Sequence, residues 1–319
     1  MIAIVKPGLL TTIQDLGRPG YAHLGVARSG ALDAPALARA NALVGNPETA
    51  AGLETTLTGV TLRTEADVSI AVTGAAAPIT VDGLPVAFDA PVEIPAGSLV
   101  EVGPAGAGVR SYVAVAGGIT VAPVLGSRAT DTLSGLGPPP MRAGFVLPLG
   151  GRGRAAGALP AETPDPAPQA STAESRRPAP QASPAESRRL APQASPEQTP
   201  AAPGELTLRV RMGPRHDWFS VPARDALVGQ PYVMTAKSNR VGARLAGPPL
   251  TRATMGELPS EGIVLGAVQV PADGQPLVFL ADHPTTGGYP VIAVVERADL
   301  PLLAQARPGT AIRFVPWTG

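Results

Sequence analysis

Short apolar runs separated by turn residues dominate the pattern of this chain. Val68, Ile70 and Val72 alternate with other residues, as do apolar positions in 206–210, and such alternation predicts β-strands. Asp-Gly at 82–83 stands between two strand-like runs and predicts a hairpin. Turn signals recur at short intervals, so the pattern favours barrels or sandwiches over alternating strands and helices. Further strands are predicted at residues 111–116, 290–295 and 311–315.

Two apolar runs near the C-terminal end, 263–270 and 276–281, read as buried strands because glycine and proline bound them. Their ends carry more hydrogen-bonding chemistry than a turn requires. A rigid sheet with polar groups at its strand ends is a common way to build a site. The polar residues concerned are Ser260, Glu261, Gln269, Asp282, His283, Thr285 and Thr286.

One helix is well specified. Asp33 is a good N-cap, Leu32 and Leu37 stand at the two positions of a hydrophobic staple, and Gly45 ends the pattern. Asn41 falls on the apolar face of this helix. It either ties down a neighbouring loop or faces a pocket, and the structural alternative is favoured because buried Asn side chains usually bond to backbone.

Residues 151–204 differ in composition from the rest of the chain. The unit A-P-Q-A-S recurs every twelve residues from Ala167, with few large apolar side chains. A short repeat can mark a solenoid, but these units lack an apolar face to stack, so we expect a disordered Pro/Ala-rich linker or insert without catalytic residues. The remaining parts, 1–150 and 205–319, are predicted to be two β domains.

Charge and composition exclude several classes of protein. The formal net charge is zero, which argues against nucleic-acid and membrane-surface binding. Cysteine is absent, and no apolar run approaches the ~20 residues that cross a bilayer. We therefore expect a soluble, cytoplasmic protein. Lys6 and Lys237 are the only lysines, so an anion site would use arginine, backbone N–H groups or a helix N-terminus.

Several common mechanisms lack their motifs. The three histidines, His23, His216 and His283, show no H-x-H or H-E-x-x-H spacing, which disfavours a zinc site. The sequence has no G-x-S-x-G elbow and no P-loop motif. An α/β-hydrolase and a P-loop nucleotide site are therefore excluded.

A long, glycine-rich polar loop at 11–33 is the first candidate site, since loops of this length in compact domains are often functional. It carries Gln14, Asp15, Arg18 and Arg28. An anion could meet Arg18 or Arg28 together with N–H groups at the start of the helix. Alternatively, Asp15 and Arg18 pair with each other to fix the turn. Both alternatives stay open.

Two further loops combine charges with amides. Arg128 and Asp131 either pair with each other, the favoured alternative, or contact substrate. Asn239 and Arg240 place a planar amide beside a fork-shaped cation, which suits carboxylate or phosphate. The neighbouring Lys237 is equally well explained as a solvated charge.

Asp282 and His283 form the fourth candidate, a base with its orienting carboxylate. Adjacent strand residues point to opposite faces, so direct pairing would need an irregular backbone. A histidine at a strand end is more often a hydrogen-bonded cap. Glu261 and Asp282 are therefore favoured over His283 as catalytic residues.

These blocks together resemble one known family. The matching motifs include K-P-G-L-L-T-T-I-Q-D-L-G-R-P-G-Y, S-G-A-L-D, A-N-A-L-V-G-N, L-G-S-R-A-T-D-T, K-S-N-R-V-G-A-R and A-D-H-P-T-T-G-G-Y-P. They closely resemble the KipA family, also known as the C subunit of 5-oxoprolinase, allophanate hydrolase subunit 2-like or the biotin-dependent carboxyltransferase family. The resemblance covers essentially all of the chain except 151–204.

The resemblance implies a mainly β fold of two cyclophilin-like barrels with few short helices. It also implies a KipI-like B subunit, with which this protein phosphorylates 5-oxoproline at the expense of ATP, with Mg²⁺, before the ring is opened to glutamate by a separate A subunit. Arg18, Arg128, Asn239 and Arg240 are carried over as phosphate-holding positions, with Glu261, Gln269 and Asp282 as polar or metal-facing partners. Including the polar loops, the candidate binding residues are Gln14, Asp15, Arg18, Asn41, Arg128, Asp131, Asn239, Arg240, Gln269, Thr285 and Thr286.

Two alternatives remain within the family. One is the carboxyltransferase component of a urea carboxylase-type system, whose biotin would be carried elsewhere because this chain has no A-M-K-M motif and Lys237 lies in A-K-S-N-R. The other is a non-catalytic regulator that binds a kinase through the KipI-like B subunit. For an enzyme, we expect residues 14–18, 239–240 and the Asp282 turn to share one anion-holding crevice.

Overall fold

The computed structural model describes residues 1–151, 204–254 and 256–317. The predicted insert at 151–204 lies almost wholly outside the described residues. The described parts belong to one compact unit, Met1–Gly153 with Ala202–Gly319. We call residues 1–151 the N-terminal half and residues 204–317 the C-terminal half. The two domain ranges given by the sequence stay a prediction.

The N-terminal half is built from two antiparallel sheets that share one aliphatic core. Alternate residues of both sheets, such as Ile4, Leu62, Ile70 and Val113, point into this core. The six-stranded sheet has the order β11-β1-β4-β9-β6-β7 and contains β1 (Ile2–Lys6), β4 (Val60–Thr64), β6 (Ile79–Val81), β7 (Leu84–Val86), β9 (Leu99–Val102) and β11 (Val146–Leu147). The five-stranded sheet has the order β2-β3-β10-β5-β8 and contains β2 (Leu10–Gln14), β3 (Gly52–Thr56), β5 (Val68–Gly74), β8 (Val92–Ile94) and β10 (Arg110–Val115).

The predicted hairpin is confirmed: Asp82 and Gly83 join β6 to β7 with φ angles of 50° and 81°. Positive φ at both central residues is the geometry of the two-residue turn that Asp-Gly favours.

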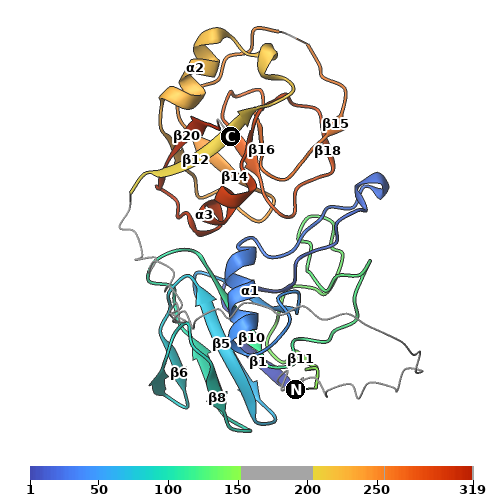
Figure 1. Ribbon diagram of the computed structural model, residues 1–319, viewed down its shortest axis with the longest axis vertical. Helices are drawn as coiled ribbons and strands as arrows, with labels where there is room; N and C mark the ends of the chain where they lie inside the picture. The colour runs from blue at the N-terminus through green and yellow to red at the C-terminus, as the bar shows by residue number, and fades with distance from the viewer. Residues whose placement is uncertain (152–203, 255, 318–319) are drawn as a thin grey trace, which may run out of the picture. The chain divides into compact units, whose positions relative to one another are not determined.

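The predicted helix is confirmed as α1 (Ala34–Leu43), which is preceded by the 3₁₀ turn η1 (Ala22–Leu24). Asp33 caps it by accepting a hydrogen bond from the Ala36 N–H (3.1 Å). The helix packs on β5 and β10, as Figure 1 shows, and buries Leu37 against Tyr112. Leu32, the other staple position, packs into the core of the C-terminal half.

The C-terminal half is a closed barrel with the strand order β12-β19-β16-β17-β14-β13-β20. Its aliphatic core includes Leu208, Val268, Val278, Ile292 and Ile312. The strands are β12 (Leu206–Met212), β13 (Tyr232–Met234), β14 (Gly242–Ala246), β16 (Ala267–Gln269), β17 (Leu277–Phe279), β19 (Val291–Val295) and β20 (Ala311–Pro316). The other elements are the short strand pair β15 (Glu261–Gly262) and β18 (Thr286–Gly287), the helices α2 (Val221–Gly229) and α3 (Leu300–Gln305), and the 3₁₀ turns η2 (His216–Trp218) and η3 (Arg297–Asp299).

The mainly β prediction is confirmed, and the strands predicted at 111–116, 290–295 and 311–315 correspond to β10, β19 and β20. The run at 263–270 was wrong as one continuous strand, because Gly266 takes a φ of 83° and turns the chain before β16 begins. Among the described residues, no helix is long and apolar enough to cross a membrane.

Candidate functional site

A buried ion network joins the two halves. Arg240, in the turn before β14, donates from Nε to Asp282 Oδ2 and from Nη2 to Asp282 Oδ1, both at 2.9 Å. It also donates from Nη1 to Glu54 on β3 and from Nη2 to the Gly30 carbonyl (2.7 Å). The three charged side chains are at most 2% exposed. Every terminal nitrogen of this guanidinium therefore has a partner within the protein.

Glu54 is the acceptor on the N-terminal side of the network. Its second oxygen accepts from the Tyr112 hydroxyl (2.9 Å) and from the Leu32 N–H (3.0 Å). Arg110 lies 3.6 Å away, measured from Nε to Glu54 Oε1. Burial first, and then the Glu54 carboxylate, raises the pKa of Tyr112 well above its ordinary value. The phenol is therefore a hydrogen-bond donor at neutral pH.

Asp282 follows β17, and both oxygens of its carboxylate also accept hydrogen bonds. Besides Arg240, it accepts from the Ser29 hydroxyl (2.7 Å) and from the Thr132 N–H (2.9 Å) and hydroxyl (2.7 Å). Burial alone would raise the pKa of Asp282, but Arg240 and the Thr132 donors outweigh it and the pKa is lowered. Burial likewise opposes the charge on Arg240, yet Glu54 and Asp282 raise its pKa. The pair is held ionised, and its acceptor positions are occupied.

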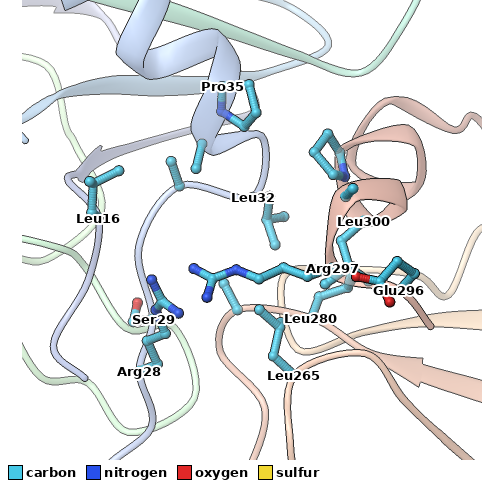
Figure 2. A pocket seen from close by; sticks show the side chains of 15 residues that line it. Leu16, Arg28, Ser29, Leu32, Pro35, Leu265, Leu280, Glu296, Arg297 and Leu300 are labelled. Atoms are coloured by element: carbon cyan, nitrogen blue, oxygen red, sulfur yellow. The ribbon is translucent and has the colours of Figure 1, made fainter. Parts of the chain in front are cut away.

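A pocket of about 530 Å³ lies beside this network. Figure 2 shows the guanidinium groups of Arg28 and Arg297 turned toward each other across it, while the Glu296 carboxylate lies at the far end of the Arg297 side chain. Burial, followed by repulsion from Arg297, lowers the pKa of Arg28. The lining residues are Leu16, Arg28, Ser29, Ala31, Leu32, Ala34, Pro35, Leu265, Leu280, Ala281, Glu296, Arg297, Ala298, Leu300 and Pro301.

Ser29 belongs to both features. It lines the pocket, and its hydroxyl lies within hydrogen-bond distance of Asp282 and of the Thr130 carbonyl (3.0 Å). Its φ is 51°, in the left-handed region that a residue other than glycine seldom adopts. Its N–H bonds to the Ala281 carbonyl (3.0 Å), which holds the loop in this conformation. Backbone held in such a conformation is frequent at binding sites.

The structure links the three regions that the sequence placed in one crevice. Gln14 donates to the Thr130 carbonyl (3.0 Å), Ser29 reaches both that carbonyl and Asp282, and Asp282 pairs with Arg240. These residues are joined by a buried network of hydrogen bonds and not across an open cleft. The anion-binding and catalytic roles of these residues stay predictions.

Asp15 and Arg18 do not form the pair considered from the sequence. Asp15 accepts from the Gly17 N–H (2.8 Å), the Ser127 hydroxyl (2.6 Å) and the Arg128 N–H (2.6 Å). Arg18 is 1% exposed and donates to the Val124 (3.3 Å) and Ala129 carbonyls, and its Nη1 has no hydrogen-bond partner among the described residues. Both side chains therefore fasten this loop to residues 124–129.

Arg128 and Asp131 also act separately. Arg128 donates from Nε to the Val121 carbonyl (2.8 Å), and Asp131 accepts from the Leu133 N–H (2.9 Å). Asn41 holds the chain that follows α1 by donating to the Ala50 carbonyl (2.8 Å), in agreement with the structural alternative. Asn239 is exposed and accepts from the Val241 N–H (2.9 Å), so it does not stand beside the buried guanidinium of Arg240.

The remaining candidates lie in and between the strands β15 to β18. Glu261 pairs with Arg215, whose hydrogen bonds lower the pKa of that carboxyl group. Gln269 donates to the Tyr289 carbonyl (2.9 Å). His283 contacts the Pro284 carbonyl through Nδ1 (2.7 Å), and burial lowers its pKa. Thr285 directly precedes β18, and Thr286 is its first residue. The Thr285 carbonyl accepts a hydrogen bond from the Ile263 N–H (2.9 Å).

Sequence reasoning missed Glu54, Tyr112 and Arg297. Glu54 left a signal, since a charged residue inside the short strand G-L-E-T-T requires a buried partner. Tyr112 looked like core. Arg297 follows β19 in a charged turn and carried no local signal. Among the described residues, no three His, Asp or Glu side chains converge as metal ligands would.

Comparisons with known proteins agree on one family. The profile of the "Carboxyltransferase domain, subdomain A and B" matches residues 24–316. The chain is 36% identical to the C subunit of 5-oxoprolinase from Escherichia coli over 318 residues, covering 99% of this chain and 91% of that protein. It is similar to the solved structure of TTHA0988, with a TM-score of 0.77 and 36% identity, and spans about half of that chain (55%). The structure of the K. lactis urea amidolyase gives a TM-score of 0.82 at 28% identity, with 99% of this chain and 19% of that chain covered.

Proposed function

This chain belongs to the family of carboxyltransferase domains with subdomains A and B, and we propose that it works as the C subunit of a 5-oxoprolinase. The observation that carries the proposal is the match to the C subunit of the E. coli 5-oxoprolinase, which covers nearly the full length of both chains at 36% identity. The pocket described above adds chemical support, because it combines leucine walls with two cations, as a small cyclic acid requires.

The reaction that we propose is the ATP-dependent phosphorylation of 5-oxoproline, carried out in the cytoplasm with a KipI-like B subunit, before the ring is opened by an A subunit. Two of the arginines that the family resemblance suggested as phosphate ligands, Arg18 and Arg240, do not fit a triphosphate. Arg240 is neutralised by two carboxylates, and the Arg18 guanidinium is buried against carbonyl groups. We therefore assign no nucleotide to these two arginines and place the binding of ATP and Mg²⁺ with the KipI-like partner.

For the substrate, the chain supplies position and environment. The apolar walls exclude water from a bound ring, and the arginine pair fixes the orientation of a carboxylate. Arg240 pairs with Asp282 and Glu54; Asp282 holds Ser29, and Glu54 holds Leu32, at the wall of the pocket through the hydrogen bonds already described.

A second candidate is the carboxyltransferase component of a biotin-dependent system. The family description and the similarity to the K. lactis urea amidolyase favour it. In that case the carboxyl donor would be a biotin carried on another domain or chain, and the same pocket would receive its ring.

The test is reconstitution. The purified chain is mixed with the KipI-like protein and the third, ring-opening component, together with ATP, Mg²⁺ and L-5-oxoproline, and the release of ADP and glutamate is followed. We expect both products to depend on 5-oxoproline and on this chain. A well-folded complex that releases ADP independently of 5-oxoproline would refute the proposal. Transfer of carbon from a carboxybiotin donor to urea in a parallel reaction would establish the second candidate.

A further inference from the structure

Two arginines face the same pocket, and neither has a carboxylate partner within the described part of the chain. Arg39, Arg110, Arg209, Arg215, Arg240 and Arg313 each lie within 4.0 Å of a carboxylate oxygen. The Arg28 and Arg297 side chains form no ion pair and no hydrogen bond among the described residues. Their guanidinium groups nevertheless turn toward each other in Figure 2.

This arrangement has an energetic cost that an anion would remove. Two like charges repel each other, and here the half-buried Arg28 guanidinium faces that of the exposed Arg297. Burial and the Arg297 charge both lower the pKa of Arg28, with burial as the larger cause. A carboxylate between the two groups would replace repulsion with two charge-assisted hydrogen-bond partners.

The other lining residues of the pocket indicate which kind of anion would fit it. Leu16, Leu32, Leu265 and Leu280 supply apolar surface, which suits a compact hydrocarbon or lactam ring. The N-terminus of α1 reaches the pocket at Ala34 and Pro35, but the Asp33 carboxylate already caps that helix. With Glu296 also on the rim, the wall suits one negative charge and disfavours the several charges of a nucleotide.

We propose that this pocket binds a small organic monoanion, with its carboxylate between Arg28 and Arg297 and its ring against the leucine wall. The identity of the natural ligand, L-5-oxoproline, rests on the proposed function. The class of ligand, a cyclic carboxylate, rests on the pocket alone.

Binding to the full chain is measured by isothermal titration calorimetry and ligand-observed NMR. The probes are L-5-oxoproline, cyclopentanecarboxylate, which keeps the ring and the charge, and pyrrolidin-2-one, which keeps the lactam and loses the charge. We expect saturable binding of both carboxylates and none of pyrrolidin-2-one. ATP at the same concentration should not displace the carboxylates. Absence of carboxylate binding, or displacement by ATP, would overturn the assignment.

The variants Arg28→Gln and Arg297→Gln test the two cations. Each should weaken carboxylate binding roughly tenfold, since it removes a hydrogen bond between charged groups. Arg28→Lys should recover part of the loss, because it restores the charge without the planar fork. Arg142→Gln is the matched control at an exposed position outside the pocket and should bind as the wild type does. Melting temperatures confirm that each variant is folded, and unchanged affinity in folded Arg28→Gln would contradict the proposal.

The reconstituted complex separates the two proposals. If it converts 5-oxoproline and Arg28→Gln leaves kcat/KM unchanged, the pocket assignment fails while the proposed function stands. If it does not convert 5-oxoproline but cyclopentanecarboxylate still binds in an Arg28-dependent way, the proposed function fails and the pocket assignment stands.

Discussion

Two groups of arginine lie side by side in this protein and differ in what surrounds them. Arg240 meets two carboxylates and a carbonyl, and it is 2% exposed. Arg28 and Arg297 meet each other across an apolar pocket and have no carboxylate partner among the described residues. A guanidinium that already faces two carboxylates has no capacity for an incoming anion, whereas one that faces another cation gains from it.

The ion network around Arg240 also supports the pocket that Arg28 and Arg297 face. Glu54, held by Arg240, accepts the Leu32 N–H, and Asp282, held by Arg240, accepts the Ser29 hydroxyl. Both Leu32 and Ser29 line the pocket. The buried ion network therefore supports one wall of the pocket, and the comparison predicts large stability effects in the network and small ones in the pocket.

Replacing Arg240 with methionine should give the largest effect. It leaves Asp282 buried without its counter-charge and Glu54 with only Arg110 at 3.6 Å, and breaking a buried pair in this way costs about 3–5 kcal/mol. We expect the free energy of unfolding, measured by urea denaturation, to fall by about that amount, and carboxylate binding to be lost with it. Arg142→Gln, exposed and outside the network, should change it by less than about 0.5 kcal/mol. A loss below about 1 kcal/mol for the Arg240 variant would show that the network is not structural.

Tyr112→Phe should give an intermediate effect. It removes the donor to Glu54 and the acceptor of the Asp33 N–H (2.8 Å) while keeping the ring in place. Leaving these buried groups unpaired should lower the free energy of unfolding by about 1–3 kcal/mol. Tyr232 is equally buried but its hydroxyl only contacts the Pro248 carbonyl at 3.3 Å, so Tyr232→Phe should cost less. Equal losses in the two variants would contradict the role given to the Glu54 contact.

The fold was largely predictable because its signals are local. Alternation located β5 and β12, short strand-like runs located β10, β19 and β20, Asp-Gly located the β6–β7 hairpin, and Asp33 located the start of α1. The error at 263–270 arose because apolar composition does not reveal the positive φ of Gly266.

The site was less predictable because its residues meet only through the tertiary fold. The sequence identified Arg240 in a polar loop and Asp282 at a strand end, but it could not show that they face each other and Glu54, which lies 186 residues from Arg240. Arg28 was considered as an anion contact, and the structure supplies its counterpart Arg297 from η3. Whether a charge is paired or free is a property of the folded chain, so residue type alone did not separate the two groups.

His283 offers a smaller, pH-dependent effect. Burial lowers its pKa below the ordinary value near 6.5, so the unfolded chain binds a proton at a higher pH than the folded chain does. Its contribution to stability is therefore complete above about pH 6.5 and declines as the pH falls toward the folded-state pKa. Urea denaturation at pH 7, 6 and 5 should show this decline in the wild type and a flatter profile in His283→Gln. Parallel profiles would show that His283 is not the group responsible.

Arg28→Gln should have the smallest effect on stability and is the sharpest test of the comparison. The side chain has no hydrogen-bond partner among the described residues, and its removal relieves repulsion with Arg297, which offsets the lost packing of its aliphatic stem. We expect the free energy of unfolding to change by less than about 0.5 kcal/mol. The wild type should gain stability relative to the variant as NaCl is raised, because salt screens the repulsion that only the wild type retains. A loss above about 2 kcal/mol would place Arg28 with Arg240 among the structural cations, because effects of that size come from broken buried networks.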